Sequence, residues 1–414
     1  MKRLTLGRLA LCVLCGASVL CIPGLASAGW FQQTSGTNNH LNSVYFPQDA
    51  FTGYAVGTYS TIIKTTNGGT TWLPQASGTN YWLSSVYFPL NASTGYVVGD
   101  IGTILKTTNG GANWVLQPTV TTNYLYSVHF PVDALTGYAV GDGGTILKTT
   151  DGGTNWVPQT SGTFQYLNSV HFPVDAQTGY AVGGWGTIRK TTNGGATWDT
   201  LNSGTTDDLE TVHFPVDVLT GYAVGGSRGG WGTILKTTDG GAAWVPQTSG
   251  TIYGLWSVHF PLDAQTGYAV GAMYDTILKT TNGGTNWVPQ PSGAMPILYS
   301  VHFPVDALTG YAVGWYGTIL KTTDGGSGVE ENAEVRGQRL EVKLTVKPNP
   351  FTSFATLPGH EAERFSLYDV SGRKVGTYRG DRVGEGLAPG VYFLCKGTAC
   401  RAPTTAPLRI VKVR

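Results

Sequence analysis

The stretch SVHFPVDALTGYAVGDGGTILKTTDGGTNW, residues 127–156, decides the fold because the chain repeats it. The phrase S-V-x-F-P, with Thr replacing Ser once, recurs at steps of 42, 42, 42, 42, 46 and 43 residues. It begins at Ser43, Ser85, Ser127, Ser169, Thr211, Ser257 and Ser300. Each unit continues with G-Y-x-V-G, then T-I-x-K-T-T, then Asn or Asp and two glycines. Repeats of this length are typical of solenoids and propellers.

Each unit contains four short runs rich in Val, Ile, Thr, Tyr and Trp, separated by clusters of Gly, Pro, Asn and Asp. This spacing predicts four strands per unit, and no apolar stripe of helical period is long enough for a helix. A single four-stranded sheet cannot bury both of its faces, so neighbouring units must stack. Radial closure also protects the sheet edges. The sequence therefore predicts an all-β, seven-bladed β-propeller over residues 29–326.

The two ends of the repeat region indicate how the ring closes. The seventh unit stops at T-T-D-G-G, residues 322–326, and lacks the Trp strand that six other units have. Residues 30–36, W-F-Q-Q-T-S-G, match the missing strand as it appears in residues 156–162, W-V-P-Q-T-S-G. We expect this N-terminal strand to complete the last blade.

Residues 1–28 are typical of a signal peptide. Lys2, Arg3 and Arg8 precede an apolar stretch, and A-S-A at residues 26–28 predicts cleavage between Ala28 and Gly29. The alternative is a transmembrane anchor, which the short apolar core disfavours. The expected location is secreted or on the cell surface, via the periplasm, with no membrane span in the mature chain.

Two resemblances concern the repeats. T-x-N-x-G-x-T-W at residues 65–72 resembles the Asp-box of bacterial-neuraminidase repeats, and G-Y-A-V-G followed by G-T-I-L-K-T-T-D-G-G resembles the photosystem II stability and assembly factor family. Both imply a propeller over residues 30–326. Asn or Asp, Gly and Trp suit a strand-to-strand turn, in which they cap the backbone, allow positive φ and pack beneath. A shared fold does not carry function with it.

The C-terminal region differs in composition and charge. Residues 30–326 have a net charge of −7 and residues 327–414 a net charge of +5, and the total of +1 argues against a nucleic-acid partner. Residues 327–345 read as a polar linker. Within residues 346–414, the motifs K-P-N-P-F, Y-D-V-S-G-R and P-G-V-Y-F and a basic last strand resemble the sorting domain of type IX secretion substrates. The alternating strands and the D-x-S-G turn predict a small β-sandwich. The resemblance implies the outer-membrane secretion machinery as a partner; an ordinary accessory β-sandwich is the alternative.

Cysteine usage adds little to this picture. Three of the five cysteines lie in the leader, which leaves Cys395 and Cys400. An exported chain would allow them to form a disulfide, and two free thiols remain the other interpretation.

Enzyme chemistry finds weak support. A sialidase would need an arginine cluster, and residues 30–326 contain only Arg189 and Arg228. Glycoside hydrolysis needs two carboxyl groups, and the acidic residues outside repeat-locked turns keep that alternative open. These are Asp100, Asp142, Asp207, Asp208 and Glu210. We predict no catalytic residue, no cofactor and no metal site.

Two repeated polar sets are interpreted as structural. The recurring histidines are expected to pack in separate blade interfaces rather than to form a metal ring, because Tyr45 and Tyr87 replace them. They are His129, His171, His213, His259 and His302. The recurring lysines, residues 64 to 321, are expected at solvated strand positions.

Comparison of the units with one another predicts a binding face. The first and third connections of each unit are nearly fixed, whereas the second and the one to the next unit vary and are rich in aromatic residues. In a four-stranded meander the two variable connections share one end of the blade. Exposed aromatic loops on a rigid scaffold favour recognition of a glycan or a protein, although packing between loops, or a structural surface protein without a ligand, would give the same pattern. The candidate ligand-binding residues are Tyr59, Tyr81, Trp82, Tyr124, Trp185, Arg228, Trp231, Tyr274, Trp315 and Tyr316.

Overall fold

The computed structural model describes residues 29–226, 231–271, 276–292 and 297–327. In the C-terminal region it describes residues 364–369, 374–379, 382–383, 385, 387–388, 390–396 and 408–412. The predicted leader with Ala28, almost all of the linker, Arg228, Tyr274, Cys400 and the side chain of Cys395 lie outside the described residues. The chain forms two compact units, Met1–Glu330 and Glu331–Arg414. No helix in the described ranges is long and apolar enough to cross a membrane.

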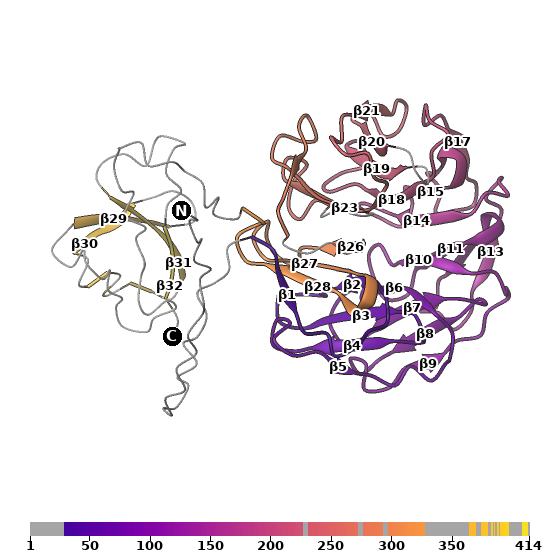
Figure 1. The fold of residues 1–414 in the computed structure, drawn as a ribbon, viewed down its shortest axis with the longest axis horizontal. Coiled ribbons are helices and arrows are strands. Elements are labelled where there is room, and N and C mark those ends of the chain that lie inside the picture. The colour runs from indigo at the N-terminus through magenta and orange to yellow at the C-terminus, as the bar shows by residue number, and fades with distance from the viewer. Residues whose placement is uncertain are drawn as a thin grey trace, which may run out of the picture. The chain divides into compact units, whose positions relative to one another are not determined.

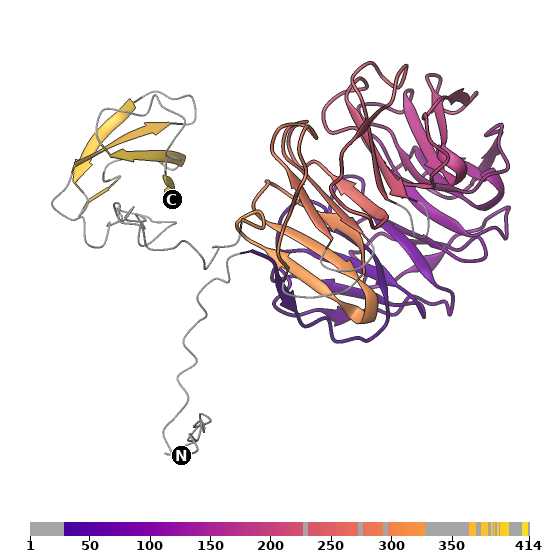
Figure 2. The same ribbon diagram turned by 45° about the horizontal axis from the view of Figure 1, so that its top comes forward.

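The first unit is a ring of seven four-stranded antiparallel sheets, so the predicted seven-bladed propeller is confirmed (Figure 1). The first strand of each blade lies nearest the centre of the ring and the fourth at the rim, as the tilted view also shows (Figure 2). The first strands are β2 (Leu41–Tyr45), β6 (Leu83–Tyr87), β10 (Leu125–His129), β14 (Leu167–His171), β18 (Leu209–His213), β22 (Leu255–His259) and β26 (Leu298–His302).

The second strands carry the G-Y-x-V-G phrase, and their residues are almost all buried. They are β3 (Gly53–Gly57), β7 (Gly95–Gly99), β11 (Gly137–Gly141), β15 (Gly179–Gly183), β19 (Gly221–Gly226), β23 (Gly267–Gly271) and β27 (Gly310–Gly314). Glycine is required at their first position because a Cβ on Gly53 would lie 2.4 Å from the ring of Phe46. Short 3-10 turns follow three of these strands: η1 (Asp142–Gly144), η2 (Gly184–Gly186) and η3 (Trp315–Gly317).

The third and fourth strands complete each blade. The third strands are β4 (Ile62–Thr65), β8 (Ile104–Thr107), β12 (Ile146–Thr149), β16 (Thr187–Thr191), β20 (Gly232–Thr237), β24 (Ile277–Thr280) and β28 (Ile319–Thr322). The fourth strands are β5 (Leu73–Pro74), β9 (Val115–Leu116), β13 (Val157–Gln159), β17 (Asp199–Leu201), β21 (Val245–Gln247), β25 (Val288–Pro289) and β1 (Phe31–Gln33). As predicted, β1 completes the seventh blade, with Phe31 opposite Lys321 and Gln33 opposite Ile319.

The core lies between the blades rather than within them. One cluster joins Tyr54, Val56 and Ile62 of the first blade to Leu83, Phe88 and other residues of the second. Tyr54 stacks on Phe88 at 4.2 Å between ring centroids, and its hydroxyl donates to the carbonyl of Gly110 at 3.0 Å. Equivalent clusters recur around the ring.

The repeated lysines also join blades, which corrects the prediction that they sit at solvated positions. The ammonium of Lys64 donates to the carbonyl of Gly110 at 2.7 Å and lies 5.3 Å from the centre of the Tyr54 ring. Every blade repeats this contact over its own tyrosine. Burial lowers the pKa of Lys64. A long side chain that reaches the next blade satisfies a turn carbonyl there.

The second unit contains one antiparallel sheet in its described residues. Its strands are β29 (Arg364–Asp369), β30 (Lys374–Arg379), β31 (Gly390–Lys396) and β32 (Leu408–Lys412), in the order β30-β29-β31-β32. The sequence predicts a small β-sandwich in this region, and the described residues form one four-stranded sheet.

Candidate functional site

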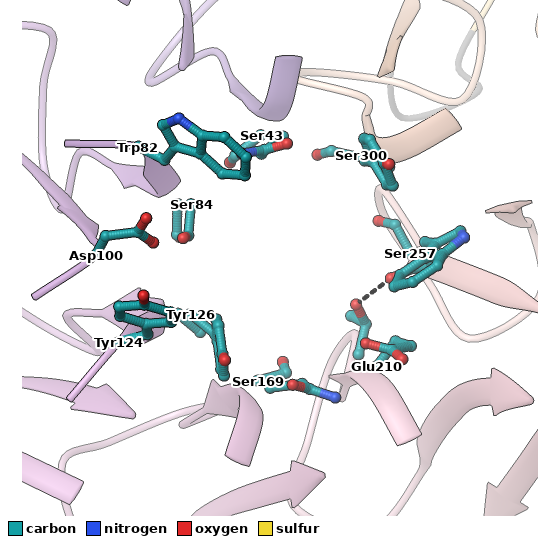
Figure 3. A pocket seen from close by; sticks show the side chains of 17 residues that line it. Ser43, Trp82, Ser84, Asp100, Tyr124, Tyr126, Ser169, Glu210, Ser257 and Ser300 are labelled. Carbon is teal, nitrogen blue, oxygen red and sulfur yellow. Dashed lines mark hydrogen bonds between the residues drawn. The ribbon is translucent and has the colours of Figure 1, made fainter. Parts of the chain in front are cut away.

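A cavity of about 840 Å³ opens at the centre of the ring, on the side of the variable connections (Figure 3). Trp82 and Tyr124 reach it from connections between blades, and Asp100 reaches it from the loop after β7. The remaining lining comes from the first strands of the blades.

A β-bulge in every first strand builds this lining. The pairing of first and second strands shifts between the leading Leu and the Ser or Thr two residues later, as between Leu125 and Ser127. Leu125 and Val128 are buried, whereas Tyr126 and Ser127 between them are half-buried and line the cavity. A bulge adds one residue and redirects side chains. Two successive residues of each blade can therefore face the cavity, where a regular strand would offer one.

The first of these two residues is the variable position in the L-x-S-V phrase. The seven blades place different side chains there, and all seven line the cavity: Asn42, Ser84, Tyr126, Asn168, Glu210, Trp256 and Tyr299. We call this set the variable ring. It offers three aromatic side chains, one carboxylate, two amides and one hydroxyl to a ligand. This combination of apolar surface and a few polar groups is typical of binding cavities.

The second residue forms a ring of hydroxyls that links blades. Ser43 Oγ accepts the N–H of Val86 at 3.3 Å, and Ser300 Oγ accepts the N–H of Val44 at 3.3 Å. The hydroxyl of Thr211 instead donates to the carbonyl of Trp256 at 2.8 Å. These bonds fix the backbone directly behind the variable ring.

The repeated histidines form one ring with Tyr45 and Tyr87, which corrects the prediction that they occupy separate blade interfaces. Adjacent ring centroids lie 4.8–5.1 Å apart all the way round. The reason is that the first strand is innermost, so residues on its channel side meet their equivalents from both neighbouring blades. The ring lies two residues beyond the Ser/Thr ring in each strand.

The histidine ring is uncharged at neutral pH. Burial lowers the pKa of His129 to about 3 and that of His213 to about 4, and the charge of His213 further lowers that of His129. Nδ1 of His129 accepts the N–H of Phe172 at 3.4 Å, and Nδ1 of His171 accepts that of Phe214 at 3.2 Å. Among the described residues no group of three or more His, Cys, Asp or Glu could hold a metal ion. The side chains of this ring pack against one another in the channel.

The carboxylates of the cavity lie on different blades. Asp100 and Glu210 face it from opposite sides (Figure 3). Burial and the nearby charge of Asp142 raise the pKa of Asp100, and the hydroxyl of Tyr126 donates to Asp142 at 2.7 Å. In the fifth blade, the acidic residues preceding Glu210 bind loops instead. Asp208 accepts the N–H of Trp185 at 2.9 Å, and Asp207 accepts the hydroxyl of Thr233.

The structure divides the predicted ligand-binding residues into two groups. Trp82 and Tyr124 line the cavity, and Trp315 contacts it through a hydrogen bond to the hydroxyl of Tyr299. The others that the structure describes are exposed on the surrounding loops without lining the cavity: Tyr59, Tyr81, Trp185, Trp231 and Tyr316. Tyr126, Trp256, Tyr299 and Glu210 belong to the cavity and were not among the predicted ligand-binding residues. The variable letter in an otherwise fixed L-x-S-V strand was the signal that would have found them.

Five non-glycine residues in the loops after the second strands adopt a left-handed backbone that L-residues rarely take: Ser60, with φ 57°, and four that share one loop position. Tyr59, Ile101, Trp185 and Tyr316 have φ between 51° and 56°, and Gly143 occupies the same loop position in the third blade. Such residues cost free energy and tend to cluster at functional sites. Large exposed side chains at these positions support a role for this face.

Comparison with known proteins agrees with the fold. Residues 22–121 and 115–206 match the sequence pattern of the family described as "Photosynthesis system II assembly factor YCF48". The structure is similar to YCF48 from Cyanidioschyzon merolae, with a TM-score of 0.60 and 23% sequence identity over 71% of this chain and 99% of that one. The two proteins share a fold. A structure of YCF48 bound to D1 peptide matches with a TM-score of 0.59 and 21% identity, over 73% of this chain and 99% of that one. No curated protein matches the chain.

Proposed function

We propose that this protein is a non-enzymatic scaffold that binds a segment of another protein in the central cavity. The observation that carries the proposal is the variable ring. The chain repeats its structural positions almost without change and varies one of the two strand positions that line the cavity. A YCF48 propeller of similar fold has been solved with a peptide bound, which supports a polypeptide ligand for this architecture.

The lining also favours a chemical class of ligand. Trp82, Tyr124, Tyr126, Trp256 and Tyr299 supply aromatic surface, which serves peptide and sugar ligands alike. Asp100 and Glu210 are the charged residues of the described lining, and no Lys, Arg or His accompanies them there. Carboxylates beside aromatic faces attract cations. The proposed ligand is therefore a segment that presents a basic side chain.

Hydrolysis of a polysaccharide is the weaker alternative. It needs two carboxyl groups flanking one bond. Asp142, Asp207 and Asp208 are engaged by Tyr126, Thr233 and Trp185. Asp100 and Glu210 face the cavity from opposite sides. This arrangement suits a ligand held between the carboxylates. An assay for reducing-sugar release from surface polysaccharides separates the two functions.

We further propose that the protein acts outside the cytoplasm. The leader motif at residues 1–28 and the type IX-like motifs after residue 346 support export through the periplasm and the outer membrane. A role in photosystem II assembly, which the name of the matched family describes, fits poorly with such a tail.

The binding proposal is tested with the chain from Gly29 to Arg414 on arrays of basic, acidic and neutral 12-residue peptides and of bacterial surface glycans. We expect saturable binding to basic peptides, weakened about 30-fold in Trp256→Ala because a buried aromatic anchor contributes about 2 kcal/mol. Asp100→Asn and Glu210→Gln should weaken binding most at low salt. Trp231→Ala is the matched control, because Trp231 is exposed on the same face and does not line the cavity.

Each other outcome changes the proposal. Retention of glycans with the same sensitivity to Trp256→Ala would make the ligand a sugar. Loss of binding in Trp231→Ala but not in Trp256→Ala would move the site to the outer loops. Unchanged melting temperatures in all variants exclude unfolding as the cause.

A further inference from the structure

The turn between the third and fourth strands has one design in six blades. In the first blade, Asn67 Oδ1 accepts the N–H of Thr71, four residues later, at 3.0 Å, and Trp72 follows. The hydroxyl of Thr70 donates to the carbonyl of Asn67 at 3.0 Å. The same hydrogen bond recurs in blades two to six, where the backbone N–H four residues after the Asn or Asp donates to its side-chain oxygen. In these blades one uninterrupted segment of the chain forms the turn.

In the seventh blade two chain segments build the same turn. Ser327 takes the place of Thr70, because its hydroxyl donates to the carbonyl of Asp324 at 3.0 Å. Gly29 takes the place of Thr71, and its N–H donates to Asp324 Oδ2 at 2.9 Å. Trp30 then packs edge-on against Phe303 at 5.8 Å, as Trp72 packs against Phe46 at 6.0 Å. The peptide bond between residues 70 and 71 thus corresponds to a gap between Ser327 and Gly29.

The predicted cleavage position falls at this gap. Hydrolysis of the Ala28–Gly29 bond by a signal peptidase consumes one water, leaves a carboxylate on Ala28 and leaves a primary amine on Gly29. We propose that Asp324 is the binding site for this amine, so that removal of the leader creates an ion pair that holds the ring shut. The ligand is the protein's own α-ammonium group.

The surroundings suit such a pair. Gly29 is buried and Asp324 half-buried, so solvent screens their interaction less than it would at the surface. An amide offers Asp324 one neutral donor, whereas an ammonium offers three donors and a positive charge, which makes the hydrogen bond shorter and stronger. Lys279 is a second cation nearby, but its ammonium is directed to the carbonyl of Gly325 at 2.8 Å.

The consequence is that ring closure depends on processing. β1 closes the propeller by pairing with β28, and Gly29 and Trp30 directly precede this strand. With the leader attached, Asp324 receives an ordinary amide hydrogen bond. After cleavage the same carboxylate binds a charged ammonium group, and the closed ring is therefore more stable in the mature chain.

The test compares two chains, one beginning at Gly29 and one at Ala28, each ending at Arg414. The second form carries the same charge, displaced by one residue or about 3.8 Å. We expect the Gly29 form to melt about 2–4 °C higher. Asp324→Asn should remove that difference, whereas the matched control Asp239→Asn should lower both forms equally, because Asp239 accepts the backbone N–H of Ala243 in a continuous turn.

The proposal fails if the two starts melt at the same temperature, or if Asp324→Asn lowers both forms by the same amount. The first comparison retains Asp324 and so remains decisive if the variant does not fold. The mass of the protein recovered from the medium of an exporting host gives a second readout. A start at Gly29 supports the pairing, and any other start overturns it.

Discussion

The seven blades differ little in sequence at one end of the propeller and much more at the other. At one end, the turns between first and second and between third and fourth strands are nearly identical, and each closes on a fixed side chain, as Asp133 does by accepting the N–H groups of Leu135 and Thr136. At the other end, the loops carry Tyr59, Trp185 or Trp231 with most of their surface exposed. The fixed end carries the repeated lysine and tyrosine bonds between blades, and the variable end surrounds the cavity.

The residues that stabilise the ring are therefore different from the residues that the ring offers to a ligand. Lys64 and Tyr54 reach the turn of the next blade, so a change there disturbs two blades at once. The variable ring instead faces the cavity, and the seven blades carry different side chains there, although Asn42 and Asn168 also donate to carbonyls of the next blade. Stability should therefore be sensitive to the repeated positions and tolerant at the variable ones.

The strongest test of this comparison is a pair of tryptophans. Trp30 at the fixed end is 4% exposed and packs against Tyr268 and Phe303, whereas Trp231 at the variable end is 73% exposed. Trp30→Ala should lower the free energy of unfolding by about 3–5 kcal/mol through the cavity it leaves. Trp231→Ala should change it by less than about 0.5 kcal/mol. Denaturant titration measures both, and similar losses in the two variants would remove the distinction.

A smaller effect is expected inside the channel, where the chain itself exchanges His for Tyr. The pKa of His129 is about 3 when folded, against about 6.5 in an unfolded chain. The unfolded state therefore binds the proton first, and stability that is complete above pH 6.5 is lost as the pH falls below it. At pH 5 one such histidine lowers the free energy of unfolding by about 1–2 kcal/mol. The lower figure allows for some access of solvent to the channel.

His129→Tyr should recover that amount at pH 5 and change little at pH 8. Tyr87, its neighbour in the ring, already shows that tyrosine fits this strand position. Denaturant midpoints at the two pH values measure the effect. If the gain is the same at both values, packing rather than protonation is responsible.

Ring closure could be predicted from the sequence because the strands of each unit can be counted there. The seventh unit lacks a Trp strand and Trp30 begins a matching one, and repeats must be completed for their faces to be covered. Strand number and turn residues followed from the same spacing.

The cavity could not be predicted in this way. Strict alternation along L-x-S-V-H would put Leu125 and Ser127 on one face, whereas the bulge buries Leu125 and turns Tyr126 and Ser127 to the cavity. The meeting of the histidines depends on the first strand being innermost, which is a property of the closed ring and not of one repeat. Loop aromatics such as Trp185 were found because they lie in the variable connections, but that location alone does not say which of them face the centre.

The smallest expected effect concerns strain at the variable end. Trp185 has φ 56° and ψ 40°, and Gly143 occupies the same loop position with φ 61° and ψ 27°. A left-handed backbone costs a residue with a Cβ about 1–2 kcal/mol, which glycine avoids. Because Trp185 is 68% exposed, its ring stabilises the fold little in return. Trp185→Gly should therefore be more stable than Trp185→Ala by about 1 kcal/mol in thermal unfolding, since both lose the ring and only the first loses the strain. Equal stability of the two variants would mean that the loop relaxes without a cost in free energy. The left-handed backbone at Trp185 would then store no strain.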